Sequence, residues 1–311
     1  MQEETLIPKI KNLLKTKNAI LLAHYYQNDD IQDIADFVGD SLDLSKKAAT
    51  TDADIILFSG VKFMADVAKI LNPNKKVLVP DLNAGCSLEE SCPPDKFKEF
   101  CQLHNDHLVI SYINCSAEVK ALSDIIVTSS NAEAIINSLD KNEKIIFAPD
   151  KNLGNYLNKK TGRNMKLWQG SCIVHEQFSL KKLIQLKERF PDANVIAHPE
   201  CPEYLLDESD FIGSTSKLLN YVKESSNNNI IVLTESGIIH QMNKINPKIN
   251  YHIVPAINDS SCTNCSNCPF MKMNDIEKIY NTILNENNEI ILPSELRDKA
   301  KKPLEKMLEI I

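Results

Sequence analysis

Short runs of β-branched and aliphatic residues alternate along this chain with longer segments of helical periodicity. The segments AEAIINSLDK (132–141) and SLKKLIQLKERF (179–190) repeat apolar residues every three or four positions, which is the period of an amphipathic helix. The apolar runs between such segments are short and rich in isoleucine and valine, as strands are. This alternation predicts βαβ units built around parallel sheets.

The pattern occurs three times along the chain. The segments ADIILFSG (53–60), SDIIVTSS (123–130) and SDFIGSTS (209–216) each hold a small residue, an aspartate, an apolar run and a hydroxyl residue five places after the aspartate. A second apolar run ends in an acid 27, 26 and 25 residues after these aspartates, at Asp81, Asp150 and Glu235. Because self-similarity at a fixed spacing indicates repeated structural units, we predict three copies of one α/β unit.

Polar clusters precede the three aspartates and cysteines follow them. The clusters are AHYYQN (23–28), SYIN (111–114) and AHPE (197–200), and the first copy carries an extra helix-like piece at 29–52. In open parallel sheets, ligands bind outside the carboxyl ends of the strands, so three such edges facing one another would enclose one central site. The alternative is that these clusters only form turns and cap helices.

Composition and charge limit the classes of function. The chain has 311 residues, 43% of them apolar and 25% charged, with a formal net charge of −7 and no long lysine or arginine block. Neither a nucleic-acid face nor a polybasic membrane patch is therefore predicted. The N-terminus lacks a long apolar segment, and no stretch approaches about 18 uninterrupted apolar residues. We expect a soluble, cytoplasmic protein that binds neither nucleic acid nor membrane.

Nine cysteines indicate metal or redox chemistry, because an odd number cannot all pair and the chain is too long for a small disulfide framework. The run CTNCSNC (262–268) lacks the fourth ligand of a ferredoxin-type site, although zinc or a cluster bound by this run alone stays an alternative. The repeat adds Cys86 and Cys172 at the ends of the first two copies. One thiolate from each copy would leave a four-iron cluster with one iron free of protein ligands, and such an iron is a Lewis acid suited to dehydration.

Ten motifs, taken together and in order, resemble the quinolinate synthase family, the iron–sulfur enzymes of de novo NAD biosynthesis. The resemblance covers nearly the whole chain, and no single motif would be specific. The motifs are AHYYQ (23–27), GDSL (39–42), PDLNAGCSL (80–88), YINCSAEVKALSD (112–124), TSSNA (128–132), GSCIVHE (170–176), HPEC (198–201), GSTS (213–216), TESGI (234–238) and CPFMKMN (268–274).

The resemblance implies an α/β fold of three pseudo-threefold-related domains, each a three-layer structure with a parallel sheet, around one central site. We place these domains at 1–87, with the extra helical insertion, at 88–174, and at 175–311, with the closing C-terminal helices. The implied reaction condenses iminoaspartate with dihydroxyacetone phosphate to give quinolinate, phosphate and two waters. An L-aspartate oxidase or dehydrogenase is then the expected supplier of iminoaspartate. The rival hypothesis is a cysteine-rich metal-binding or redox-sensing protein that performs no turnover.

The resemblance also implies a 4Fe–4S cluster with three cysteine ligands and one open iron. Its ligands would be Cys86, Cys172 and Cys268, since the family ligand is similar to the cysteine before PFMKMN (269–274). Cys262 and Cys265 would then be nearby free thiols. The other cysteines fit small buried apolar positions, and they are Cys92, Cys101, Cys115 and Cys201.

Substrate groups are expected to meet residues from all three copies. Glu200 is the candidate general acid or base, and His198, Tyr26 and Tyr112 are the other candidate catalytic residues. The expected substrate-binding residues are His24, Ser41, Tyr112, Asn114, Ser129, His198, Glu200 and Thr215.

Four further residues have open interpretations. Ser59 is expected to cap a helix rather than bind substrate. His175 and Glu176 follow Cys172 closely and could orient the cofactor or contact substrate. Lys272 could hold an anion or cap the last helix.

Overall fold

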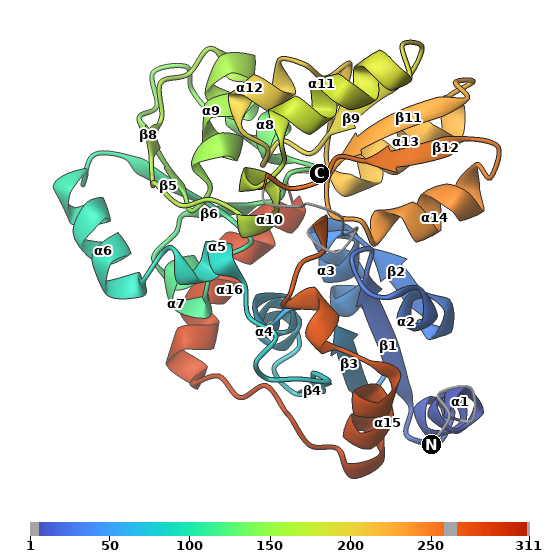
Figure 1. The fold of residues 1–311 in the computed structure, drawn as a ribbon. Coiled ribbons are helices and arrows are strands. Elements are labelled where there is room, and N and C mark those ends of the chain that lie inside the picture. The colour runs from blue at the N-terminus through green and yellow to red at the C-terminus, as the bar shows by residue number, and fades with distance from the viewer. Residues whose placement is uncertain (1–5, 258–265, 310–311) are drawn as a thin grey trace.

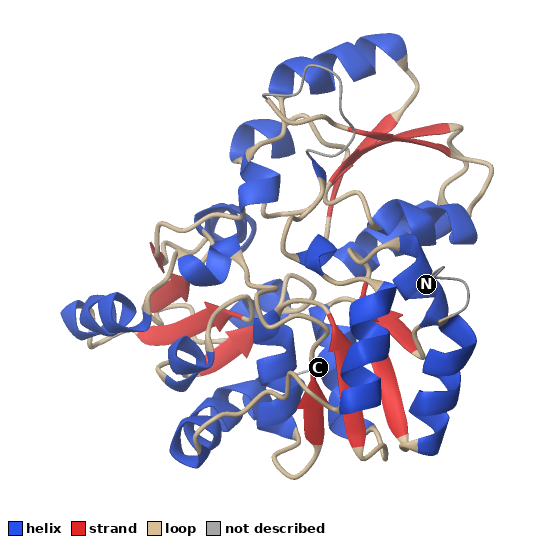
Figure 2. Ribbon diagram, turned by 60° about the horizontal axis from the view of Figure 1, so that its bottom comes forward, coloured by secondary structure: helices blue, strands red, loops and turns tan. Residues whose placement is uncertain are grey.

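The computed structural model describes residues 6–257 and 266–309. Cys262 and Cys265 lie outside the described residues. The strands form three separate four-stranded sheets, and every strand pair within them is parallel. Helices flank each of the three groups of strands (Figure 1 and Figure 2). The predicted three-unit α/β fold is confirmed, whereas the domain limits at 87/88 and 174/175 stay a prediction.

The first unit has the sheet order β2-β1-β3-β4, and helix α1 precedes it. Its elements are α1 (Ile7–Thr16), β1 (Ala19–His24), α2 (Asp29–Ile34), β2 (Phe37–Gly39), α3 (Ser41–Thr50), β3 (Ile55–Ser59), α4 (Lys62–Leu71) and β4 (Lys76–Leu78).

The second unit repeats this order as β6-β5-β7-β8. Its elements are α5 (Ser87–Glu90), α6 (Pro94–Leu103), β5 (Leu108–Tyr112), α7 (Ala117–Ala121), β6 (Ile125–Val127), α8 (Ala132–Ser138), β7 (Ile145–Ala148), α9 (Lys151–Thr161) and β8 (Lys166–Leu167).

The third unit repeats it again as β10-β9-β11-β12. Its elements are α10 (Ile173–Glu176), α11 (Leu180–Arg189), β9 (Asn194–Ala197), α12 (Glu203–Leu206), β10 (Phe211–Ile212), α13 (Thr215–Glu224), β11 (Asn229–Leu233), α14 (Ile238–Ile245) and β12 (Asn250–Ile253). The chain then continues through η3 (Met271–Met273), α15 (Ile276–Asn285) and α16 (Ser294–Glu309).

One aspartate marks the same position in every unit, just before the edge strand β2, β6 or β10. Its carboxylate accepts a hydrogen bond from a backbone N–H on the central strand, Asp36 from Leu21 at 2.8 Å, Asp124 from Val109 at 2.8 Å and Asp210 from Val195 at 2.7 Å. The internal repeat predicted from the sequence pairs Asp54 with Asp124 and Asp210. This pairing is wrong for the first copy. Asp54 instead precedes β3, the strand that corresponds to β7 and β11.

This corrected register changes two expectations for the first unit. Segment 29–52 holds α2, β2 and α3, which correspond in order to elements of the other two units, so it is not an insertion. Ser41 lies five residues after Asp36 and is therefore the first-unit counterpart of Ser129 and Thr215. Ser59 does not cap α4, because the N-cap residue of that helix is Val61. The Ser59 hydroxyl instead donates to Gln27 Oε1 at 3.0 Å.

The inner strands are largely buried because helices and neighbouring units cover the faces of the sheets, and all five residues of β3 are buried. The edge strands β8, β10 and β12 are partly exposed. The largest apolar cluster joins the first and second units through residues such as Phe58, Phe63 and Phe147. Helix α15 packs with α1 on the first unit, and α16 packs against α4, α7 and β6. The C-terminal helices thus cover the first and second sheets rather than the third.

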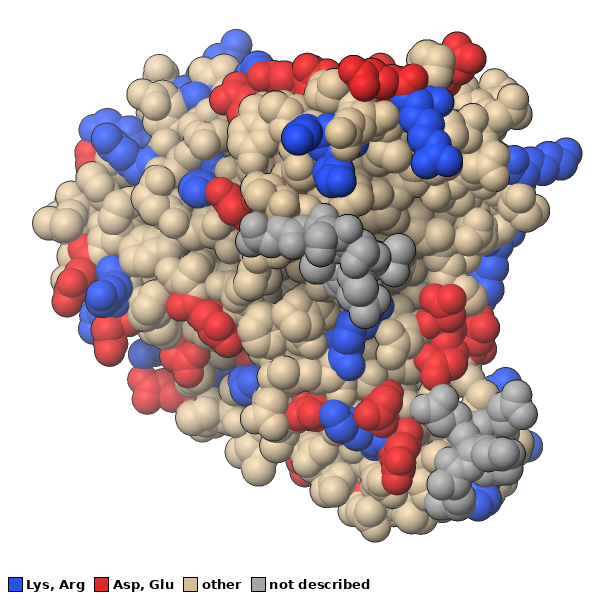
Figure 3. All heavy atoms as spheres, viewed as in Figure 1, with Lys and Arg blue, Asp and Glu red and all other residues tan. Residues whose placement is uncertain are grey.

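Charged side chains of both signs lie interspersed on the face shown in Figure 3. Within the two described ranges, no helix has both the length and the apolar character needed to cross a membrane.

Candidate functional site

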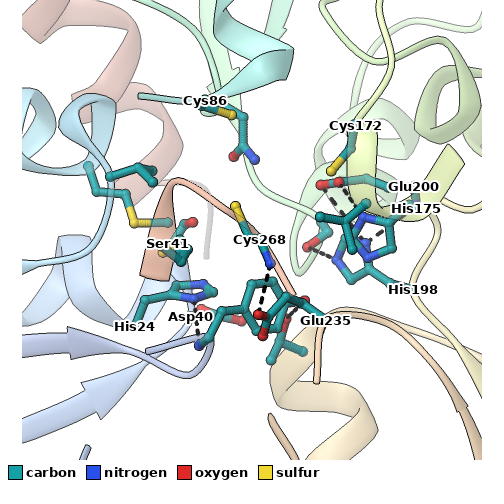
Figure 4. Close-up of a pocket in the computed structure, with 18 of the residues that line it drawn as sticks. His24, Asp40, Ser41, Cys86, Cys172, His175, His198, Glu200, Glu235 and Cys268 are labelled. Carbon is teal, nitrogen blue, oxygen red and sulfur yellow. Dashed lines mark hydrogen bonds and ion pairs between the residues drawn. The ribbon is translucent and has the colours of Figure 1, made fainter. Parts of the chain in front are cut away.

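A cavity with about 640 Å³ of empty volume lies where the three units meet. All twelve residues that the sequence singled out for catalysis, substrate binding and metal ligation line it (Figure 4). They are His24, Tyr26, Ser41, Cys86, Tyr112, Asn114, Ser129, Cys172, His198, Glu200, Thr215 and Cys268. Their roles remain predictions.

The ends of the central strands provide the first layer of this wall. β1 ends at His24 and β5 at Tyr112, and His198 directly follows β9. In the first and third units, Nδ1 of the histidine accepts a hydrogen bond from the backbone N–H two residues later. His24 Nδ1 accepts from Tyr26 N at 3.1 Å, and His198 Nδ1 accepts from Glu200 N at 3.4 Å. Each ring therefore carries its hydrogen on Nε2, and His198 Nε2 donates to Ser129 Oγ at 3.2 Å.

Both histidines are neutral at neutral pH. Burial lowers the pKa of His24 to about 4 and that of His198 to about 4, and nearby carboxylates only partly oppose this shift. His24 can therefore donate a hydrogen bond to a ligand, and His198 can orient the Ser129 hydroxyl, without either ring bringing a positive charge.

A second layer comes from the turns after the edge strands. Ser41 and Thr215 are the first residues of α3 and α13, and Asp40 and Ser214 are the N-caps of those helices. One carboxylate oxygen of Asp40 accepts hydrogen bonds from Leu42 N and Asp43 N, both at 3.0 Å.

The other oxygen of Asp40 joins the three units. It accepts hydrogen bonds from Ser130 Oγ and Ser216 Oγ, both at 2.8 Å, and Ser130 Oγ lies 2.8 Å from Ser214 Oγ, whose hydroxyl can donate to it. We call these four residues, Asp40, Ser130, Ser214 and Ser216, the three-unit junction. The junction fixes the hydroxyl turns relative to one another.

Glu200 receives contacts from the second and third units. Tyr112 Oη donates to Glu200 Oε1 at 2.6 Å, and His175 Nδ1 lies 3.0 Å from Glu200 Oε2. Burial opposes the charged form of Glu200, but the nearby His175 and His198 and the Tyr112 hydroxyl hold its pKa below the usual range. Burial, together with the Glu200 charge, raises the pKa of Tyr112 well above its usual range. At neutral pH this pair is a carboxylate and a phenol.

Thr234 extends this network to the first unit. Its Oγ1 lies 3.0 Å from His175 Nε2 and 2.7 Å from Tyr26 Oη, and the same phenol lies 3.0 Å from Thr215 Oγ1. Burial raises the pKa of Tyr26 well above its usual range, so this phenol also stays protonated. Hydrogen bonds therefore connect Tyr26 through Thr234 to His175, whose Nδ1 then faces Glu200 Oε2 at 3.0 Å without forming a hydrogen bond. Sequence reasoning assigned no role to Thr234, although this residue opens the motif TESGI (234–238) and directly follows the buried strand β11.

The three lining cysteines occupy the same local structure. The carbonyl oxygens of Cys86, Cys172 and Cys268 accept hydrogen bonds from the N–H four residues later, at 2.9, 3.0 and 3.1 Å. Each thiol thus stands at the start of one helical turn, before α5, α10 or η3. This shared position supports Cys268 as the third-unit counterpart of Cys86 and Cys172.

Backbone N–H groups of these turns favour the thiolate form of the cysteines. Burial raises the pKa of Cys86 and Cys172 well above the usual range and that of Cys268 to about 11. Backbone N–H groups oppose that shift at each sulfur. They come from Glu89 and Leu88 at Cys86, from His175 at Cys172, and from Met271 and Phe270 at Cys268. A metal cofactor would supply the positive charge that buried thiolates require, so this donor set fits one.

Glu235 holds the Cys268 turn in place. One of its oxygens accepts from Cys268 N at 3.0 Å, and the other accepts from Gly237 N at 2.6 Å. A side chain at Gly237 would clash with the backbone of Tyr26, because an added Cβ would lie 2.8 Å from Tyr26 Cα. Lys272 lies 3.5 Å from Glu235 and donates to Tyr26 O at 2.9 Å, so its ammonium group is engaged within the protein.

The remaining singled-out residues, apart from His175, lie outside the cavity lining. Cys92, Cys115 and Cys201 are buried in apolar clusters, as expected for small core residues. Cys101 is only partly buried at the edge of such a cluster, so the same expectation is wrong for it. Glu176 is outside the cavity lining and binds Lys151 and Asn152, whereas His175 lines the cavity.

Comparison with known proteins gives one consistent result. The family model described as "Quinolinate synthetase A protein" matches residues 8–309. The quinolinate synthase of Trichodesmium erythraeum is 55% identical over 307 residues, which cover 99% of this chain and 94% of that protein. The quinolinate synthase of Synechocystis is 57% identical over 303 residues, 97% of this chain and 94% of that protein. The quinolinate synthase of Chloroherpeton thalassium is 56% identical over 305 residues, 98% and 94% of the two chains.

Proposed function

The chain belongs to the quinolinate synthetase A family and is an enzyme of the quinolinate synthase type, and from this premise we propose that it condenses iminoaspartate with dihydroxyacetone phosphate. The products are quinolinate, one phosphate and two waters, so the atoms balance without an added oxidant or reductant. Enzymes of this type act in NAD biosynthesis. An L-aspartate oxidase or dehydrogenase would supply the unstable imine, and the odd number of cysteines suits a reducing, cytoplasmic location.

We propose that Cys86, Cys172 and Cys268 hold a 4Fe–4S cluster. The observation that carries this proposal is the arrival of one thiol from each unit, in the same helical turn, at one cavity. Cys86, Cys172 and Cys268 are not all within 4.8 Å of one another, which suits a multi-iron cluster better than a single ion held by three thiolates. With three protein ligands, the cluster supplies Lewis-acid chemistry at its fourth iron.

Glu200 is the proposed general base. It is ionised at neutral pH, it is buried, and it lines the cavity between Tyr112 and His175. Loss of water and movement of a double bond both require a base that removes a proton from carbon or nitrogen. Glu200 performs that step, and His175 then faces the oxygen atom opposite the one bound by Tyr112.

Tyr112 and Tyr26 are the proposed proton donors. Both phenols stay protonated and lie at opposite ends of the path through Thr234 and His175. A proton taken up at Glu200 can be returned through Tyr112, which contacts it directly. It can also reach the Tyr26 end if His175 Nδ1, 3.0 Å away, accepts it and Nε2 releases a proton toward Thr234. This arrangement serves leaving oxygens on two sides of the cavity.

Neutral donors hold the anionic groups of the substrates. Ser41, Ser129 and Thr215 offer hydroxyl groups, and His24 offers its Nε2 hydrogen. His198 donates its Nε2 hydrogen to Ser129 Oγ, which leaves the Ser129 hydroxyl hydrogen to point at a substrate oxygen. Hydrogen bonds of this type to charged oxygens contribute about 1.5–3 kcal/mol each. The buried Asn114 Oδ1 has no hydrogen-bond partner among the described residues, so it can accept from a substrate hydroxyl.

The test is anaerobic purification of the wild type beside Cys86→Ala, Cys172→Ala, Cys262→Ala, Cys265→Ala and Cys268→Ala, with iron and sulfide analysis, EPR and an assay for quinolinate. We expect about four irons per chain in the wild type. Iron and activity should disappear in the Cys86, Cys172 and Cys268 variants and persist in the other two.

The opposite pattern would contradict the proposal. Iron or zinc that survives loss of Cys86 and Cys172 but not of Cys262 or Cys265 would indicate a metal site within the run 262–268, as the cysteine-rich metal-binding hypothesis requires. A peptide spanning 255–275 would then retain the metal.

A further inference from the structure

Three different ligand types meet on one side of the cavity. The Cys172 sulfur, a nitrogen of His175 and a carboxylate oxygen of Glu200 all lie within 4.8 Å of one another. In the described part of the chain, this is the one group of three or more histidine, cysteine, aspartate or glutamate ligand atoms so close together. His175 and Glu200 are buried, and Figure 4 shows the three side chains turned toward one another.

The distances between these ligand atoms suit tetrahedral coordination of one metal ion. Zinc bonds of about 2.0–2.1 Å to nitrogen and oxygen place two tetrahedral ligands about 3.3 Å apart, and the bond to sulfur is about 0.2–0.3 Å longer. His175 Nδ1 and Glu200 Oε2 already lie 3.0 Å apart. A small outward adjustment of these two groups would accommodate the ion.

His175 is prepared for such a role. Its Nδ1 is buried and has no hydrogen-bond partner in the described residues, because the nearby Glu200 oxygen is not aligned for a hydrogen bond. Its Nε2 lies 3.0 Å from Thr234 Oγ1. A metal-bound histidine commonly donates its other N–H to such a partner, which fixes the ring and strengthens the ligand.

We propose that Cys172, His175 and Glu200 form a site for one divalent transition-metal ion, with zinc as the best match, when the three-cysteine cofactor is not bound. A thiolate and a carboxylate together neutralise the charge of the ion, and water from the cavity takes the fourth position. Because Cys172 belongs to both ligand sets, the ion and the cluster exclude each other; that exclusion rests on the proposed function, whereas the binding of zinc does not.

The test uses the full chain, freed of metal anaerobically, with Cys262→Ser and Cys265→Ser as the background so that the run 262–268 does not contribute. Zn²⁺ is titrated against a chelating indicator, and Co²⁺ is added separately because its absorption reports tetrahedral geometry and sulfur ligation. We expect one ion per chain with thiolate-to-cobalt absorption. Cys172→Ser, His175→Ala and Glu200→Gln should each weaken zinc binding by more than about 100-fold, and Thr234→Val by about 10-fold.

Two variants provide matched controls. Cys86→Ser removes a lining cysteine outside the group, and Glu176→Gln removes a nearby carboxylate outside the cavity lining. Both should bind zinc like the background protein, and urea unfolding curves show whether any variant has lost its fold. Equal loss of zinc in Cys86→Ser and Cys172→Ser, with His175→Ala unaffected, would overturn the proposal in favour of a site made by the three cysteines. Binding that no variant weakens would overturn it as well.

The two proposals fail separately. Zinc binding is measured on metal-free protein and does not require quinolinate formation. Absence of zinc binding would leave the iron analysis and the enzyme assay intact, and absence of a cluster would leave the zinc titration interpretable.

Discussion

The three cysteine turns and the three strand ends face the same cavity, but they relate to the repeat in opposite ways. Cys86, Cys172 and Cys268 share one residue type, one helical turn and one backbone hydrogen bond. The strand ends instead pair a histidine with Tyr26 in the first unit, Tyr112 with Asn114 in the second, and a histidine with Glu200 in the third.

This difference follows from what each region would bind. On the proposed function, a cofactor shared by three units would make the same demand on each of them, so equivalent positions would keep the same residue. Two different substrates would present different groups to each unit, so equivalent positions would diverge. A threefold scaffold thus supports both a symmetric and an asymmetric site.

The largest effect is expected from replacing the Glu200 carboxylate, the strand-end group that has no counterpart in the other two units. Glu200→Gln keeps the size of the side chain but abolishes the base, so we expect kcat for quinolinate formation to fall by about 10²–10⁴-fold with little change in KM or iron content. Glu176→Gln, which alters a carboxylate outside the cavity lining, is the control. A normal kcat in Glu200→Gln would show that the strand ends do not differ in the way proposed.

The next effect concerns the strand-end histidines His24 and His198. The second unit has Tyr112 at the equivalent strand end. The pKa of each histidine is about 4 in the folded protein and 6.5 as the reference value. The unfolded chain therefore binds more protons between these pH values, and the free energy of unfolding falls as pH falls from about 6.5 to 4, by up to about 3 kcal/mol per histidine.

Urea unfolding of the metal-free chain at about pH 7 and pH 4.5 measures this loss. The double variant His24→Gln and His198→Gln should lose less stability over the same interval. An equal loss in the variant would place the acid sensitivity outside the strand ends.

A smaller effect is expected at the hydroxyl turns. Ser41→Ala removes one hydrogen bond to an anionic substrate group, which is worth about 1.5–3 kcal/mol, so KM should rise about 10–100-fold at nearly constant kcat. Ser45→Ala, on the same helix but outside the cavity lining, should leave KM unchanged. Steady-state kinetics with each substrate in turn decide which anion Ser41 contacts, and an unchanged KM for both would remove Ser41 from the site.

The smallest effect tests the symmetric scaffold. Asp36→Ala, Asp124→Ala and Asp210→Ala each remove the same bond to a central strand, so each should lower the free energy of unfolding by a similar amount, about 0.5–1.5 kcal/mol. The corresponding asparagine variants keep an acceptor oxygen and should lose less. A much larger loss in one unit would show that the scaffold is less symmetric than its hydrogen bonds indicate.

The sequence predicted the three units because buried strands and polar strand ends have local signatures. It misaligned the first copy because the run at 55–59 resembles the other copies more closely than the short strand β2 does. The order of the strands in the sheet and the bond between Asp36 and the central strand, neither of which a local pattern encodes, identify the true register.

The site was partly within reach of sequence reasoning. Motif positions brought out the twelve lining residues, but the path through Thr234 joins residues 59 and 208 positions apart in the chain. Such contacts depend on how the third unit packs against the first. The sequence likewise predicted closing C-terminal helices but could not show that α16 packs on the first and second units.

The positions of the three cysteines along the chain also bear on the order of synthesis, folding and cofactor insertion. Domains generally fold from the N-terminus during synthesis, so the sheets of the first two units can begin to form before α15 and α16, which pack against them, have been made. On the proposed ligand set, Cys86 and Cys172 would be made well before Cys268. The cofactor would then have to wait for Cys268, whereas Cys172, His175 and Glu200 all precede it, so a competing ion would have its best opportunity to bind in that interval.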